Sequence, residues 1–131
     1  MDIRQTHILI VDDSEDERNM HAYYLTRKGY RVSKALDGEE GLKKALALEP
    51  DIIVLDLWLP KISGWGVLLR LKSAERTKHI PVLIVTGDAS VQPQECEGLL
   101  TKPCPPDELG AEVARRVRGH AARRSSGPPL L

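Results

Sequence analysis

The chain has 131 residues, and its 19 basic and 19 acidic side chains give a formal net charge of zero. This length suits one domain with a single core, and the balanced charge argues against a strongly electrostatic nucleic-acid binder. The apolar runs are too short to span a membrane, and residues 1–6 lack the layout of a signal peptide. We therefore expect a cytoplasmic protein whose partners include neither nucleic acid nor a membrane.

The cysteines and histidines do not suggest a metal or redox site. Cys96 and Cys104 lack the spacing of zinc or redox motifs, and we expect both to be reduced thiols. The four histidines are scattered along the sequence, so we expect each to lie at the surface or to be hydrogen-bonded in the core.

The first apolar run, HILIV at 7–11, is followed by a helix expected over 14–28. Ser14 can cap this helix, and acidic residues fill its first turn. Its apolar face is expected at Met20, Tyr23, Tyr24 and Leu25. The expected elements that follow are, in chain order, a strand at 30–36, a helix at 39–48, a strand at 51–57, a helix at about 64–75, strands at 81–87 and 98–102, and a helix at about 106–122.

This alternation of strands and helices predicts a mostly parallel sheet. The runs at 7–11, 51–57 and 81–87 have continuous apolar centres, as expected for strands covered on both faces, whereas the run at 30–36 is mixed and suits an edge. Right-handed crossovers then favour a doubly wound α/β sheet. We expect residues 1–122 to form this domain and the turn-rich residues 123–131 to form a disordered C-terminal tail.

Five polar residues stand at the carboxyl ends of the expected strands, where doubly wound sheets carry their sites. They are Asp12 and Asp13 after the first strand, Asp56 in the third, Thr86 in the fourth and Lys102 in the fifth. Three neighbouring carboxylates repel one another and require a cation, which Lys102 and Mg2+ could supply. With the metal bound, one carboxylate could attack phosphorus and form an aspartyl phosphate. The alternative is that each acid merely caps a helix or a turn.

Four motifs strengthen this interpretation: VDD at 11–13, DLWLPKISG at 56–64, VTG at 85–87 and TKP at 101–103. In this combination and order the chain resembles the receiver domain of bacterial two-component response regulators, over residues 6 to about 122. The resemblance implies a flavodoxin-like α/β fold, with a five-stranded parallel sheet of order 2-1-3-4-5.

The resemblance also implies a role for each motif residue. Asp56 would accept a phosphoryl group from a histidine kinase or a histidine phosphotransfer protein. Asp12, Asp13 and Asp56 would hold Mg2+, and the backbone carbonyl of Trp58 would be a further ligand.

The other two polar residues would contact the phosphoryl group itself. Thr86 would bond one of its oxygens, and Lys102 would pair with its charge. The resemblance further implies that the peptide bond between Lys102 and Pro103 is cis, a state that only an X-Pro bond reaches at low cost.

The sequence departs from the family pattern in two places. Leu99 stands three residues before Lys102, where receivers commonly carry Tyr or Phe, and we expect it to be a core residue. Thr86 and Lys102 are 16 positions apart, fewer than in the family. Because residues 87–97 then form nearly the whole connection, we expect the family's fourth helix to be short or absent.

The function that these residues imply is that of a stand-alone, chemotaxis-receiver-like phosphoacceptor. It would be a monomer that signals to an unidentified downstream protein rather than an enzyme. One alternative is a docking adaptor that keeps the fold without needing phosphorylation. Another is an aspartyl-phosphate hydrolase, but such enzymes need a second acid two residues after the nucleophile, and this chain has Trp58 at that position.

Overall fold

The computed structural model describes residues 6–88 and 98–125. Its five strands are β1 (His7–Val11), β2 (Arg31–Ala35), β3 (Ile52–Asp56), β4 (Val82–Thr86) and β5 (Gly98–Thr101). All neighbouring pairs are parallel, and the order in the sheet is β2-β1-β3-β4-β5. The predicted flavodoxin-like, doubly wound sheet of order 2-1-3-4-5 is therefore confirmed.

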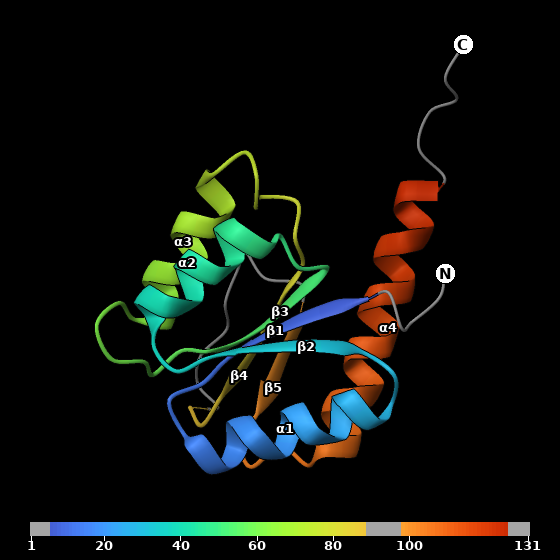
Figure 1. Cartoon of the computed structure of the whole chain (residues 1–131), viewed down its shortest axis with the longest axis horizontal. Coiled ribbons are helices and arrows are strands. Elements are labelled where there is room, and N and C mark those ends of the chain that lie inside the picture. The colour runs from blue at the N-terminus through green and yellow to red at the C-terminus, as the bar shows by residue number, and fades with distance from the viewer. Residues whose placement is uncertain (1–5, 89–97, 126–131) are drawn as a thin grey trace.

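Helices cover both faces of this sheet. They are α1 (Glu15–Arg27), α2 (Gly38–Leu48), α3 (Gly64–Ser73) and α4 (Pro106–Ser125). Figure 1 shows α2 and α3 side by side on one face, with α1 and α4 on the other. Side chains cap three of them: Ser14, Asp37 and Ser63 each accept a hydrogen bond from a backbone N–H in the first turn. The last helix ends at Ser125 rather than at the predicted residue 122.

The core consists of two apolar layers, one on each face of the sheet. Successive strand residues point to opposite faces, so Ile8 and Ile10 of β1 pack toward α1 and α4, while Leu9 and Val11 pack toward α2 and α3. Every residue of β1, β3 and β4 is buried. The mixed strand β2 lies at an edge of the sheet, as predicted.

The inward face of α1 agrees with the prediction at Tyr24 and Leu25, which pack in the core, and differs from it at Met20 and Tyr23. Met20 is 42% exposed and Tyr23 is 68% exposed, whereas His21, Ala22 and Leu25 are buried. The imidazole Nε2 of His21 lies 3.0 Å from the carbonyl oxygen of Cys104, and this hydrogen bond makes burial of a histidine acceptable. The prediction passed over the polar His21 and the small Ala22, and it placed Met20 and Tyr23 on the buried face instead.

Several expectations concern the region between β4 and β5 and the C-terminal end. Leu99 is half-buried and packs against the apolar layer beneath α2 and α3. Three expectations fall outside the described residues: the short or absent fourth helix of the family, the state of Cys96, and the end of the C-terminal tail. Within the described ranges, Cys104 is a free, buried thiol, and no helix combines the length and apolar character needed to cross a bilayer.

Candidate functional site

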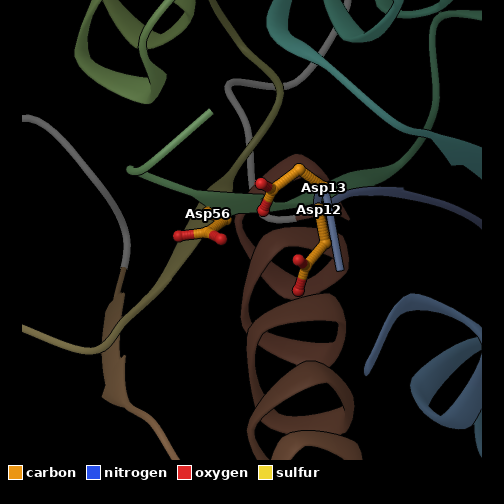
Figure 2. A group of neighbouring side chains, drawn as sticks. All are labelled: Asp12, Asp13 and Asp56. Atoms are coloured by element: carbon orange, nitrogen blue, oxygen red, sulfur yellow. The ribbon is translucent and has the colours of Figure 1, made fainter. Parts of the chain in front are cut away.

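Three carboxylates meet at the carboxyl ends of β1 and β3. Asp12 and Asp13 directly follow β1, and Asp56 is the last residue of β3. These two strands are neighbours in the sheet, so the three side chains lie side by side, and one oxygen of each lies within 4.8 Å of the other two (Figure 2). Asp12 and Asp56 are buried, whereas Asp13 is exposed. Such a concentration of negative charge requires nearby cations.

Lys102 supplies one positive charge to this cluster. Its Nζ lies 3.2 Å from Oδ2 of Asp12 and 3.1 Å from Oδ2 of Asp56. A further carboxylate, that of Glu17 in α1, lies 2.5 Å from the same Nζ. Burial alone would lower the pKa of Lys102, but the contacts with Glu17, Asp12 and Asp56 outweigh it and raise the pKa above its usual value. Lys102 therefore stays charged at neutral pH.

The two buried acids are also held by the backbone. The N–H of Ser14 donates to Oδ1 of Asp12 at 2.9 Å, and the N–H of Trp58 donates to Oδ1 of Asp56 at 3.1 Å. Burial raises the pKa of Asp12, and the hydrogen bond from Ser14 and the charge of Lys102 oppose that rise. Each of these carboxylates thus keeps one oxygen on a backbone donor and the other on Lys102.

Thr86 and Lys102 are placed by the neighbouring strands β4 and β5. Thr86 is fully buried, and its Oγ1 accepts a hydrogen bond of 3.2 Å from the N–H of Asp88. The N–H of Lys102 donates to the carbonyl of Thr86 at 2.7 Å, which ties the two strand ends together. The peptide bond between Lys102 and Pro103 is cis, as the resemblance implied.

The loop from β3 to α3 passes close beneath Asp56. The N–H of Gly64 donates to the carbonyl of Leu57 at 2.9 Å. A Cβ atom on Gly64 would come closer than 3.0 Å to the carbonyl oxygen of Asp56 and to Cα of Leu57. On the outer side of this loop, a groove of about 350 Å³ is lined by Asp13, Trp58 and Trp65 among others. The acidic cluster is therefore open to an approaching molecule on the side of Asp13.

The cluster fits a small divalent cation. Asp12, Asp13 and Asp56 each offer a carboxylate oxygen, and among the described residues Lys102 is the one cation that contacts the carboxylates of Asp12 and Asp56. Oxygen ligands of this hard, charged kind are those that Mg2+ prefers, and Mg2+ is commonly bound through one or two carboxylates together with waters and phosphate oxygens. The donor set is thus suited to Mg2+.

The sequence matches the response regulator receiver domain over residues 8–114. The chain belongs to the response regulator receiver family. Among known receivers and their relatives, it is 38% identical to the DNA-binding dual master transcriptional regulator RpaA of Synechocystis over 85% of its own length and 48% of that protein. It is 31% identical to the two-component response regulator ORR5 of Oryza sativa, over 86% of this chain and 89% of that one.

The fold agrees with that of solved receivers. The chemotaxis protein CheY4 of Vibrio cholerae superposes with a TM-score of 0.77 at 29% identity, covering 85% of this chain and 98% of that chain. The receiver described here spans about half the length of RpaA and of the alkaline phosphatase synthesis transcriptional regulatory protein PhoP of Bacillus subtilis.

The five polar residues predicted from the strand ends all stand at the same edge of the receiver's sheet. Sequence reasoning missed two further features of this site, Glu17 and Gly64. Glu17 is one of the acidic residues in the first turn of α1, where acidic side chains are expected from helix capping alone, so its sequence position gave no sign of a role in the site. Gly64 closes the DLWLPKISG motif, yet only the folded loop shows that it touches the backbone of Asp56.

Proposed function

We propose that this receiver accepts a phosphoryl group on Asp56 from a histidine kinase or a histidine phosphotransfer protein, in the cytoplasm. In this proposal Asp12, Asp13, Asp56 and the backbone carbonyl of Trp58 hold Mg2+. The observation that carries it is the position of Asp56, at the end of a buried strand, beside two further acids and 3.1 Å from Nζ of Lys102. A carboxylate in this setting is fixed in place and paired with a cation.

The reaction transfers one phosphoryl group between two nucleophiles. A carboxylate oxygen of Asp56 attacks phosphorus, the new P–O bond forms as the P–N bond to the donor histidine breaks, and the imidazole leaves with the electron pair and takes up a proton. Lys102 then pairs with a phosphoryl oxygen, and the hydroxyl of Thr86 turns from Asp88 to bond another. Bound Mg2+ supplies positive charge at the transferring oxygens.

The proposal is tested by incubating the protein with a small acyl phosphate and Mg2+ and measuring its intact mass. We expect one phosphoryl group per chain, lost on alkaline or prolonged acid treatment as for an acyl phosphate. A chelator added before the donor should prevent incorporation. Absence of labelling in the folded protein would favour the docking adaptor instead, and sustained turnover of free phosphate esters would favour a hydrolase.

Metal binding predicts a stabilising effect of Mg2+ that depends on Asp13. A ligand that binds only the folded state stabilises it by about 1.4 kcal/mol at ten times its dissociation constant, so thermal melts should shift upward with Mg2+. Asp13→Asn should remove most of this shift, because a neutral amide is a weaker ligand for a hard cation.

The matched control is Asp16→Asn, which makes the same chemical change at an exposed acid in the first turn of α1, outside the cluster of three. It should keep the full Mg2+-dependent shift. Melts of the wild type that do not move with Mg2+, or an equal loss of the shift in both variants, would contradict this metal site.

A further inference from the structure

The ammonium group of Lys102 is surrounded by carboxylates. An ammonium group has three N–H donors and no acceptor. In this structure three carboxylates surround its Nζ: Asp12 at 3.2 Å, Asp56 at 3.1 Å and Glu17 at 2.5 Å. Lys102 hydrogen-bonds Asp12 and Asp56 and forms an ion pair with Glu17, so an incoming phosphoryl oxygen must compete with one of these three partners for the ammonium group.

Glu17 is the partner most easily released. The side chains of Asp12 and Asp56 are each 6% exposed, whereas that of Glu17 is 36% exposed and can return to water at lower cost. Asp12 and Asp56 also accept backbone hydrogen bonds. Among the described residues, Oε2 of Glu17 accepts no aligned hydrogen bond, so the ion pair with Lys102 is what holds it there.

Glu17 is not needed at this position to cap its helix. Residues 14–17 have the pattern of a capping box, in which the glutamate side chain would bond the backbone N–H of Ser14. One half of the box forms, since Oγ of Ser14 accepts from the N–H of Glu17 at 3.3 Å. The N–H of Ser14 donates instead to Asp12 at 2.9 Å. The carboxylate of Glu17 is thereby left to pair with Lys102.

We propose that Glu17 is a positioning residue that occupies Lys102 before phosphorylation and is displaced from it by the phosphoryl group. This inference rests on the proposed phosphorylation of Asp56. The displacement has two consequences. First, Glu17 competes with the phosphoryl group for Lys102 and so opposes phosphorylation. Second, its release frees a side chain in the first turn of α1, so phosphorylation of Asp56 changes the contacts of that helix.

The first test compares the binding of beryllofluoride, a phosphoryl mimic, to three proteins in the presence of Mg2+. Glu17→Gln keeps the size of the side chain and removes its charge, so Lys102 is released more easily. We expect it to bind the mimic about threefold to tenfold more tightly than the wild type, a range that allows for solvent screening of a partly exposed pair. Dissociation constants are read from the intrinsic fluorescence of Trp58 and Trp65.

Glu15→Gln is the matched control, because Glu15 is an exposed acid in the same turn of α1. It loses the same charge at the same helix end and should bind like the wild type. Tighter binding by both variants to the same degree would show a general charge effect and would overturn the assignment to Glu17. Equal constants for all three proteins would also overturn it. A wild type that binds no beryllofluoride would overturn the proposed phosphorylation and this inference with it.

The second test observes the displacement directly by NMR. The side-chain carboxyl carbon of Glu17 should shift toward the position of the solvent-exposed Glu15 when beryllofluoride and Mg2+ are added. The resonance of Glu15 should stay in place. A role for Glu17 confined to stabilising α1 predicts no such movement, so an unchanged Glu17 resonance in a protein that binds the mimic would refute the displacement.

Discussion

Replacing Asp56 with asparagine should abolish phosphoryl transfer and leave the protein folded. The amide has the shape of the carboxylate, and its oxygen can still accept the hydrogen bond that the N–H of Trp58 donates at 3.1 Å. It is a far poorer nucleophile toward phosphorus, however, and it cannot form an acyl phosphate. In Asp56→Asn we therefore expect no phosphoryl group by intact mass after treatment with an acyl phosphate and Mg2+. Far-ultraviolet circular dichroism and thermal melting check the fold.

The same strand offers a matched control at its other end. Asp51 precedes β3, and its Oδ2 accepts a hydrogen bond of 2.7 Å from the N–H of His7 at the edge of the sheet opposite the acidic cluster. Asp51→Asn makes the same substitution about 17 Å away along an extended strand and should be phosphorylated like the wild type. Labelling of Asp56→Asn at the wild-type level would show that another residue is the acceptor.

The sheet and the position of its site could be predicted because local patterns determine both. Continuous apolar runs such as 52–55 occur in strands buried on two faces, and the polar residues that end those runs, Asp56 and Thr86 among them, must meet at one edge once the strands are parallel. The mixed run at 30–36 was correctly predicted to be an edge strand, because its polar residues do not suit a strand covered on both faces. Predicting the strands and the position of the site required only strand periodicity and sheet topology, and no knowledge of how the side chains pack.

The features that could not be predicted depend on contacts between distant segments. His21 faces inward because a carbonyl 83 residues away accepts its hydrogen bond, which helical periodicity alone does not indicate. Glu17 pairs with Lys102 rather than completing its capping box because Asp12 already accepts the N–H of Ser14. In both cases the local pattern allowed two arrangements, and tertiary hydrogen bonds or ion pairs selected one of them.

Gly64 is a third feature of this kind, and its replacement by alanine should strongly destabilise the receiver. A Cβ atom on this residue would lie closer than 3.0 Å to the carbonyl oxygen of Asp56 and to Cα of Leu57. Both are backbone atoms, so the clash cannot be relieved by rotating a side chain. The start of α3 or the end of β3 must move instead. We expect Gly64→Ala to lower the free energy of unfolding by about 3 kcal/mol, at the upper end of typical overpacking costs.

Gly66→Ala separates this clash from the general effect of alanine in a helix. Gly66 lies two residues further along α3, and the nearest atom to its added Cβ would be Cγ2 of the half-buried Ile62 at 2.9 Å, a side-chain methyl that can shift. Alanine also has a helix propensity about 1 kcal/mol better than glycine, so the stability of Gly66→Ala should stay within about 1 kcal/mol of the wild type. Urea denaturation of the three proteins measures both differences, and equal stabilities for Gly64→Ala and the wild type would show that α3 can retreat from β3 at no cost. The added Cβ of Gly64→Ala would press on the backbone carbonyl of Asp56 and so shift the phosphoacceptor itself. Any Gly64→Ala protein that remains folded should therefore also be phosphorylated more slowly.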